Sequence, residues 1–416
     1  MSRLAEYAVP ARLGRPFRWL LASSWISNIG DGIALAAGPL LVASQTHDPM
    51  LVALAGLLQR LPWLLFGLFA GVIADRLDRR LIVVVADLLR AVVLVALAVT
   101  VVTGSVNIAL VLVTMFLLGA AETFADTTSS TLMPMIVAKA DYGIANARLM
   151  AGFITANQLA GPPIGAALFA AGMSVPFVTQ AVCVALGALL VSRIAFPAHG
   201  TQREERQHVR RDIAEGMRWL WRNPPVRTLA LTIITFNVTF GAAWSVLVLY
   251  AIERLHMGAM GFGLITTAVA VGGLVATSSF GWLERRVSLA TLMRGCLITE
   301  TITHLVLATT TVAWVALVTF FFFGVEAFIW GTTAQSVRQR AVPTDFQGRV
   351  GSVYMIGVIG GMVAGGALGG VIARQWGVTG PFWFAFVGSA LILALIWREL
   401  ANIAHADEDV RAEQPA

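Results

Sequence analysis

Long apolar stretches recur along the whole chain, and polar residues are confined to the short segments between them. Each stretch has about 20 residues or more, enough for an α-helix to cross the roughly 30 Å hydrocarbon core of a bilayer. The pattern therefore predicts an all-α membrane protein with twelve transmembrane helices. The twelve stretches are residues 17–44, 50–73, 81–103, 106–130, 146–171, 174–197, 226–251, 259–283, 288–311, 313–336, 350–373 and 377–398.

Composition and charge support this class. Hydrophobic residues make up 57% of the chain and charged residues 12%, whereas a soluble domain carries about 25% charged residues. Basic residues gather in the N-terminal segment and in alternate loops, which places both termini in the cytoplasm by the positive-inside rule. The net charge of +6 is accounted for by these loops, so no nucleic-acid partner is expected. The basic positions on this side are Arg3, Arg12, Arg15, Arg76, Arg79, Arg80, Lys139, Arg203, Arg206, Arg210, Arg211, Arg218, Arg222, Arg285, Arg286, Arg338 and Arg340.

The two halves of the chain repeat each other weakly. A shift of 209 residues carries Asn28 onto Asn237 and Gly32 onto Gly241, and a shift of 204 carries Glu122 onto Glu326. Six spans followed by six similar spans form a parallel repeat, an organisation seen in transporters. We expect an N-terminal six-helix bundle at residues 1–197, a cytoplasmic linker at 198–224, a C-terminal six-helix bundle at 225–400 and a cytoplasmic tail at 401–416.

The linker has its own pattern. Its apolar residues fall on one face of a helix and its arginines lie largely around the other, which is typical of a helix lying on a membrane surface; a plain linker is the alternative. The apolar positions are Val209, Ile213, Met217, Leu220 and Trp221.

Between the second and third spans lies a dense charge cluster, Ala70 to Arg80. It resembles the signature loop of major facilitator superfamily transporters, and its Asp-Arg-x-Asp-Arg-Arg form resembles that of bacterial drug and siderophore exporters. The resemblance implies two pseudo-symmetric six-helix bundles in a bacterial inner membrane and a loop that latches the cytoplasmic side, with Asp75 engaging the start of span 11. Asp78 departs from the pattern, where the family has a second glycine, and a bland positive-inside loop is the alternative. The latch residues implied are Gly71, Asp75, Arg76, Arg79 and Arg80, together with Asp87 and Arg90.

A second family cue is Gly161-Pro162-Pro163-Ile164-Gly165 in the fifth span. It resembles the core of a motif associated with exporters, although position 166 is alanine rather than glycine. Small residues also let helices approach closely and proline bends a helix. A packing site is therefore the alternative interpretation.

Charged side chains inside spans are costly, at about 2.5–3.5 kcal/mol each on insertion scales, so they usually face a cavity or a partner. Asp31 lies near the middle of the first span, and we expect it to be a proton-coupling site, since burial favours the protonated form of a carboxyl group. The alternative is an ion pair with Arg60 at similar depth. The charged positions inside spans are Asp31, Arg60, Asp87, Arg90, Glu122, Asp126, Glu300 and Glu326.

Three further acids are candidates for proton coupling. Glu122 and Asp126 are four residues apart and share a helical face, and Glu326 is the repeat partner of Glu122. A latch role is an equal alternative for Asp126. Glu300 and His304, one turn apart on an outer span of the implied architecture, are expected to bond each other or a neighbouring helix.

The implied architecture also places spans 1, 4, 7 and 10 around a central cavity. An acid with aromatic side chains there suits a lipophilic cation, through charge pairing and cation–π attraction. Packing or lipid contact is the alternative for the aromatic residues. The expected cavity residues are Asn28, Arg60, Asn237, Trp244, Phe328 and Trp330.

The chain carries no Gly-x-x-x-x-Gly-Lys-Ser/Thr loop for ATP, and its cytoplasmic loops show no catalytic or metal-ligand cluster. We therefore expect a transporter rather than an enzyme, with no cofactor beyond a proton gradient and no metal. Membrane lipid and a small amphipathic substrate are the expected partners, with no obligate protein partner. The favoured function is proton-coupled efflux of a drug, siderophore or secondary metabolite by alternating access. Proton-symport uptake of a metabolite, lipid or lysolipid translocation, and a non-transporting sensor remain alternatives.

Overall fold

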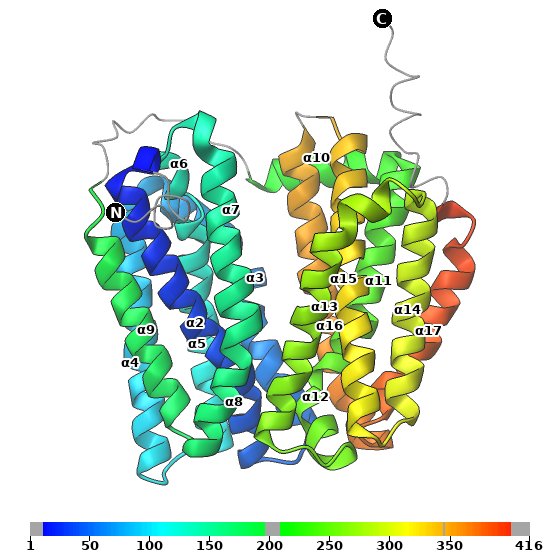
Figure 1. The fold of residues 1–416 in the computed structure, drawn as a ribbon, viewed down its shortest axis with the longest axis horizontal. Helices are drawn as coiled ribbons and strands as arrows, with labels where there is room; N and C mark the ends of the chain where they lie inside the picture. Colours follow the sequence, from blue (N-terminus) through cyan, green and yellow to red (C-terminus); the bar gives the residue numbers. More distant parts are fainter. Residues whose placement is uncertain (1–10, 196–208, 344–345, 401–416) are drawn as a thin grey trace, which may run out of the picture. The chain divides into compact units, whose positions relative to one another are not determined.

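The structure is a computed structural model that describes residues 11–195, 209–343 and 346–400, and within these ranges every regular element is helical (Figure 1). The chain divides into two compact units, which correspond closely to its two halves. The first unit contains most of the N-terminal half together with Gly258–Thr267. The second contains most of the C-terminal half together with Asp48–Leu54.

The first half of the chain is helical from Ala11 to Ser192, with short connections. Its elements are η1 (Ala11–Leu13), α2 (Gly14–Gln45), α3 (Pro49–Arg76), α4 (Arg79–Val102), α5 (Ile108–Ser129), α6 (Met133–Ile136), η2 (Lys139–Asp141), α7 (Tyr142–Gly152), η3 (Phe153–Ala160), α8 (Gly161–Ala171) and α9 (Val175–Ser192).

The second half follows the linker helix. Its elements are α10 (Val209–Arg222), α11 (Pro224–Ser245), α12 (Leu247–Leu249), η4 (Tyr250–Arg254), α13 (Ala259–Glu284), α14 (Leu289–Thr309), α15 (Ala313–Ala341), α16 (Gln347–Trp376) and α17 (Gly380–Ile396).

Each predicted apolar stretch coincides with helical structure. Within the described ranges, nine helices are long and apolar enough on their own to cross a membrane. Three stretches are too short, too polar or too interrupted to meet this criterion. Helix α17 has only 17 residues, and α14 carries Arg294, Glu300 and His304. The fifth span, expected as one helix over 146–171, is divided into α7, η3 and α8.

A π-helical segment, η3, interrupts the fifth span just before Pro162 and Pro163. Proline has no backbone N–H and its ring clashes with the carbonyl four residues earlier, so the regular ladder cannot continue through this pair. Wider π-helical bonding accommodates the break without ending the helix. The seventh span is also irregular: α11 ends at Ser245, and α12 and the π-helical η4 follow.

The charge cluster between the second and third spans is mostly helical, which corrects the expected loop at Ala70–Arg80. Helix α3 continues to Arg76 and α4 begins at Arg79, so only Leu77 and Asp78 connect them. Asp78 is the N-cap of α4: its Oδ1 accepts hydrogen bonds from the backbone N–H of Arg80 at 2.9 Å and of Leu81 at 3.4 Å. With a φ of −62°, this position does not require a glycine.

Replacing Asp78 by alanine is expected to weaken the start of α4 by about 1 kcal/mol, because two backbone N–H groups lose their side-chain acceptor. Hydrogen exchange of the Arg80 and Leu81 amides should then be faster by about fivefold. Asp78→Ser, which keeps an acceptor, should exchange as the unmodified protein does. Equal protection in the alanine and serine variants would contradict the capping role.

Glycines bring helix backbones into direct contact in the first unit. A Cβ atom added at Gly165 of α8 would overlap the carbonyl oxygen of Ile33 on α2, and one added at Gly161 would overlap Gly32. A Cβ at Gly119 of α5 would likewise overlap the carbonyl oxygen of Gln59 on α3. The Gly161–Gly165 motif is thus a helix-packing site in this structure.

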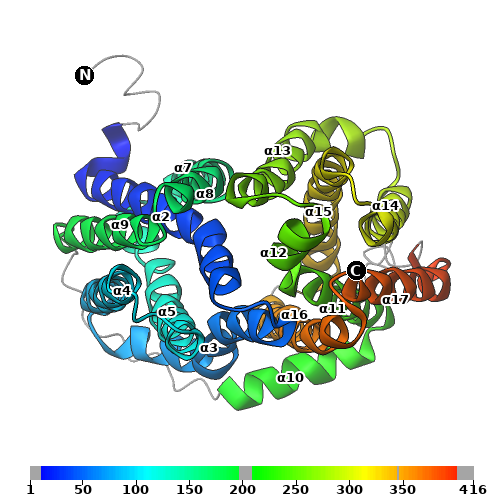
Figure 2. The ribbon, with the colours of Figure 1, turned by 90° about the horizontal axis from the view of Figure 1, so that it is seen from below.

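The second unit repeats the same contacts. Gly365 and Gly369 of α16 lie 204 residues after Gly161 and Gly165 and pack against the carbonyl oxygens of Val238 and Ala242 on α11. Helices α11 and α16 lie side by side (Figure 2). Gly324 of α15 packs against the backbone of α13 as Gly119 packs against α3. The weak sequence repeat therefore corresponds to a repeated way of packing helices.

Replacing Gly165 by alanine is expected to destabilise the protein by about 1–3 kcal/mol, because the added methyl group meets backbone that cannot rotate away. Gly331 of α15 provides a matched control, since a Cβ there meets nothing within 4 Å. Gly331→Ala should instead stabilise its helix by about 0.5–1 kcal/mol. Thermal unfolding in detergent should shift in opposite directions for the two variants, and a shift of the same sign would contradict the packing argument.

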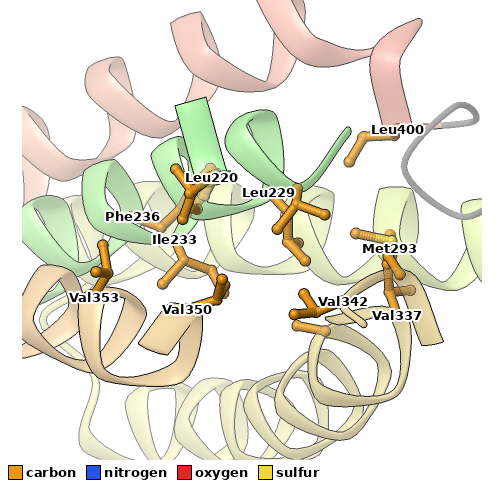
Figure 3. Packing of buried hydrophobic residues seen from close by; sticks show 14 of the residues in the cluster. Leu220, Leu229, Ile233, Phe236, Met293, Val337, Val342, Val350, Val353 and Leu400 are labelled. Carbon is orange, nitrogen blue, oxygen red and sulfur yellow. The ribbon is translucent and has the colours of Figure 1, made fainter. Parts of the chain in front are cut away.

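A large apolar cluster in the second unit gathers side chains from α10, α11, α14, α15 and α16 (Figure 3). Helix α10 joins it through Leu220 and is also held by a salt bridge of 3.2 Å between Glu215 and Arg349. Met217 and Trp221, expected on the same apolar face as Leu220, are exposed on the surface of the protein. The side chains of Val209 and Ile213, the linker residues 198–208 and the tail 401–416 lie outside the described part of the chain.

Candidate functional site

A buried arginine on α4 holds two carboxylates in the first unit. The Arg90 side chain is 4% exposed; its Nη2 donates to Oδ1 of Asp31 on α2, and its Nη1 donates to Oδ1 of Asp87 at 3.1 Å. Gln180 of α9 donates from Nε2 to the same Asp31 oxygen at 3.4 Å. We call Asp31, Asp87, Arg90 and Gln180 the Arg90 cluster.

Helix geometry brings the cluster together. Asp87 and Arg90 are three residues apart and share one face of α4, and α9 packs against both α2 and α4. Gly30 and Gly32, on either side of Asp31, pack closely against Cys183 of α9 and against the backbone of η3. The backbone of Asp31 is therefore held by close contacts on both sides, which limits where its carboxylate can lie.

The expected alternative for Asp31, an ion pair with Arg60, is wrong, because Arg90 is the partner. Arg60 donates from Nη1 to the carbonyl oxygen of Gly56 at 3.2 Å, one turn earlier on α3, and it interacts electrostatically with Glu122 of α5. Residue counting gives the approximate depth of a side chain in the membrane. It does not determine which neighbour the side chain faces.

The other two acids of the first unit lie near the same arginine. Glu122 is half-buried and Asp126 is exposed, and both interact electrostatically with Arg90. Four carboxylates, at positions 31, 87, 122 and 126, thus share two arginines, at positions 60 and 90. The four negative charges exceed the two positive charges, so carboxyl groups near the cluster can bind protons while both guanidinium groups stay compensated.

The latch residues separate into two groups. At the short connection, Arg79 donates from Nε to the carbonyl oxygen of Ala74 at 3.1 Å, and Arg80 donates from Nη1 to that of Ile194 at 3.3 Å. Arg76 is exposed and Gly71 is half-buried in α3, while the side chain of Asp75 lies outside the described part.

Asp87 and Arg90, grouped with the latch from sequence, belong to the Arg90 cluster: Arg90 donates hydrogen bonds to both Asp31 and Asp87. They lie eight and eleven residues after Arg79, which corresponds to roughly 12 and 16 Å along the helix at 1.5 Å per residue.

The two symmetric amides behave alike. Asn28 donates from Nδ2 to the carbonyl oxygen of Ser24 at 2.7 Å, and Asn237 donates to that of Ile233 at 2.8 Å. Each bond runs one turn back along its own helix, and both side chains are half-buried. The equivalent positions in the two halves therefore have the same local geometry.

Aromatic side chains of the second unit form a cluster around Trp244 of α11. Its ring centroid lies 4.9 Å from that of Phe240 and 6.1 Å from that of Phe323. A small apolar pocket adjoins them, lined by Phe240, Trp244, His304, Phe320, Phe323 and Phe382, among others.

Phe328 and Trp330 take the packing role that was the alternative interpretation. A Cβ at Gly273 of α13 would meet the Phe328 ring, and Trp330 packs against two apolar clusters.

Glu326 of α15 interacts electrostatically with Glu300 of α14 rather than lying isolated among aromatic residues. The Oε1 of Glu300 and the Nε2 of His304 are 3.7 Å apart, an ion-pair distance longer than a hydrogen bond. All three side chains are buried. From their one-turn spacing on an outer span, Glu300 and His304 are expected to bond each other or a neighbouring helix, and they lie at ion-pair distance from each other.

Comparisons with known proteins agree on the class. Residues 9–415 match a family described as transmembrane secretion effector. The multidrug efflux pump Tap of Mycolicibacterium fortuitum is 28% identical over 375 residues, which cover 86% of this chain and 88% of that protein. The MFS-type transporter YfiS of Bacillus subtilis (strain 168) is 25% identical, covering 91% of this chain and 90% of that protein.

Solved structures give the same architecture. A bacterial homologue of the iron transporter ferroportin in its inward-facing state has a TM-score of 0.74 at 16% identity and covers 97% of this chain and 100% of that chain. A mutant form of the nucleoside transporter NupG has a TM-score of 0.73 at 12% identity and covers 93% of this chain and 100% of that chain. Together with the helices and the repeated packing, the family match shows that this chain is a multi-pass membrane transporter of the major facilitator fold and belongs to the transmembrane secretion effector family.

Proposed function

We propose that the protein exports a small amphipathic compound, such as a drug, siderophore or secondary metabolite, in exchange for protons. It would act by alternating access in a bacterial inner membrane, with both termini in the cytoplasm. The observation that carries the proposal is the Arg90 cluster, in which a partly accessible carboxylate, Asp31, shares a buried arginine with Asp87. The similarity to the Tap multidrug efflux pump supports efflux as the direction.

The cluster suits proton exchange because its arginine has two acceptors. When Asp31 takes up a proton, its ion pair with Arg90 is weakened, while Asp87 still compensates the guanidinium. The Asp31 side chain is 21% exposed and that of Asp87 is 7% exposed. Asp31, the more accessible of the two, would therefore exchange its proton with water, and Asp87 would remain paired with Arg90.

Substrate recognition follows from the remaining acids. Glu122 and Asp126 are accessible to different degrees near the arginines, and carboxylates of this kind attract a cation. Aromatic rings such as Trp244 add cation–π attraction. A lipophilic cation is thus the favoured substrate class. The connection after Arg76 would act as the cytoplasmic latch, with Asp75 engaging the start of α16.

Inside-out membrane vesicles supplied with a panel of fluorescent lipophilic cations test this function. An imposed proton gradient, acidic inside, should drive dye accumulation, and a protonophore should abolish it. If no dye moves at any pH, the multidrug interpretation fails. Accumulation of substrate by right-side-out vesicles under an inward proton gradient would instead indicate symport, and competition by added phospholipid would indicate lipid translocation.

A further inference from the structure

The second unit contains a buried group of ionisable side chains that export through Asp31 does not use. Glu300 is 7% exposed, His304 is 3% exposed and Glu326 is 5% exposed. Within the described residues, Oε2 of Glu326 and both ring nitrogens of His304 are buried without a hydrogen-bond partner. We call these three side chains the Glu300 group.

Glu300 lies at the same position along its helix as Arg90 does in the first half. Arg90 is eleven residues after the first residue of α4, Arg79, and Glu300 is eleven residues after the first residue of α14, Leu289. Glu326 is the repeat partner of Glu122. The second half therefore keeps the acid on the fourth span of its bundle, but has an acid where the first half has its buried arginine.

Nearby cations are engaged elsewhere. Arg294 of α14 donates to the carbonyl oxygen of Trp397 at 3.2 and 2.9 Å, and Arg254 donates to the carbonyl oxygens of Thr310 and Thr309 at 3.2 Å each. Cys296 of α14 and Tyr250 of η4, whose hydroxyl donates to the carbonyl oxygen of Leu307, are further titratable groups near α14. On α15, which packs on α14, Arg338 lies over the ring of Tyr354 and Arg340 is 3.5 Å from Glu284. Helix α17, packed on α14, has no charged residue between Gly380 and Ile396.

Charge counting then gives the protonation state. With a neutral imidazole and two carboxylates, the group would carry two negative charges, although all three side chains are buried and His304 lines an apolar pocket. Two isolated charges are strongly disfavoured there. Two bound protons make the group neutral: one converts His304 to an imidazolium that pairs with one carboxylate, and the other makes the second carboxyl group uncharged.

We propose that Glu300, His304 and Glu326 form a second proton-binding site, in which two protons take the place of the arginine found in the first unit. Its ligand is the proton rather than a metal ion, since no group of three His, Cys, Asp or Glu side chains among the described residues is arranged to hold one. His304 also lines the aromatic pocket beside Trp244. The site therefore adjoins the surface of that pocket through its imidazole.

Infrared spectroscopy of the purified full-length protein in lipid nanodiscs tests the proposal through the C=O absorption of protonated carboxyl groups. Glu326→Gln and Glu300→Gln should each lose the same component, because the remaining carboxylate then pairs with the imidazolium. His304→Gln should increase that component about twofold, because neutrality then requires both carboxyl groups to be protonated. Size-exclusion chromatography identifies any variant that does not fold.

Asp141→Asn is the matched control and should leave this component unchanged, because Asp141 lies in η2 outside the membrane-spanning helices and pairs with Arg12 at 3.2 Å. Spectra of Glu326→Gln and Glu300→Gln that match the unmodified protein at every pH would overturn the proposal, and so would an unchanged signal in folded His304→Gln. If one variant fails to fold, the other two still test the proposal. Each of them has an expected loss or gain of the C=O component, and an unchanged spectrum would contradict it. The measurement requires no transported substrate, so its outcome is independent of the dye assay.

Discussion

Asp31→Asn should reduce gradient-driven dye accumulation in inside-out vesicles to the level measured without a gradient. Asparagine has nearly the shape of aspartate, and its Oδ1 can still accept from Arg90, so the cluster should remain assembled. It cannot take up or release a proton in the transport cycle. Dye should still bind and exchange across the membrane down its own concentration gradient, which separates loss of coupling from loss of folding.

Asp141→Asn provides the matched control for this experiment. Asp141 also forms an ion pair with an arginine, Arg12 at 3.2 Å, but it lies in η2 outside the membrane-spanning helices. Its variant should accumulate dye as the unmodified protein does. Full gradient-driven accumulation by Asp31→Asn would show that coupling resides elsewhere, and Glu122 and Asp126 would become the next residues to test.

Arg90→Leu should destabilise the protein by about 3–5 kcal/mol, since it leaves the carboxylates of Asp31 and Asp87 without their shared cation in a buried position. The loss is measurable as reduced thermal stability in detergent and reduced yield. Adding Asp87→Asn to this variant should recover part of the loss, because one uncompensated charge is removed.

Arg285→Leu supplies the comparison for Arg90→Leu. Arg285 is exposed beyond the end of α13, and loss of an exposed charge usually changes stability by less than about 0.5 kcal/mol. An Arg90→Leu protein as stable as Arg285→Leu would mean that the buried carboxylates are already neutral without the arginine. Such a result would remove the physical basis of the Arg90 cluster.

The apolar stretches predicted the helices because a span needs only length and hydrophobicity, and both are properties of the sequence. Local chemistry decided where those helices begin, end and break. Asp78 caps α4, so the charged connection is two residues long, and the Pro162–Pro163 pair converts the helix before it to π geometry. Both signals were present in the sequence, but neither residue type by itself specifies how far the adjoining helix extends.

The sequence indicated which residues of the candidate site are charged groups inside helices, but not which side chains they contact. Asp31 was identified as a buried acid, but its partnership with Arg90 depends on how α2 and α4 are rotated about their axes. On α2, close contacts of Gly30 with α9 and of Gly32 with η3 limit this rotation, and α4 packs on α9 in turn. The same reason explains why Glu326 was assigned to a cavity with Phe328 and Trp330 and not to a group with Glu300 and His304.

The glycine contacts also separate two properties that evolution can change at different rates. At Gly32, Gly161 and Gly165, helices of the first unit meet through their backbones, and Gly365 and Gly369 do the same in the second. Most substitutions at these positions would force the helices apart, whereas a change in an aromatic side chain such as Trp244 leaves their spacing intact. Under the proposed function, exchanging a side chain such as Trp244 would change the substrate range, while the glycine contacts would keep the backbone around Asp31 in place.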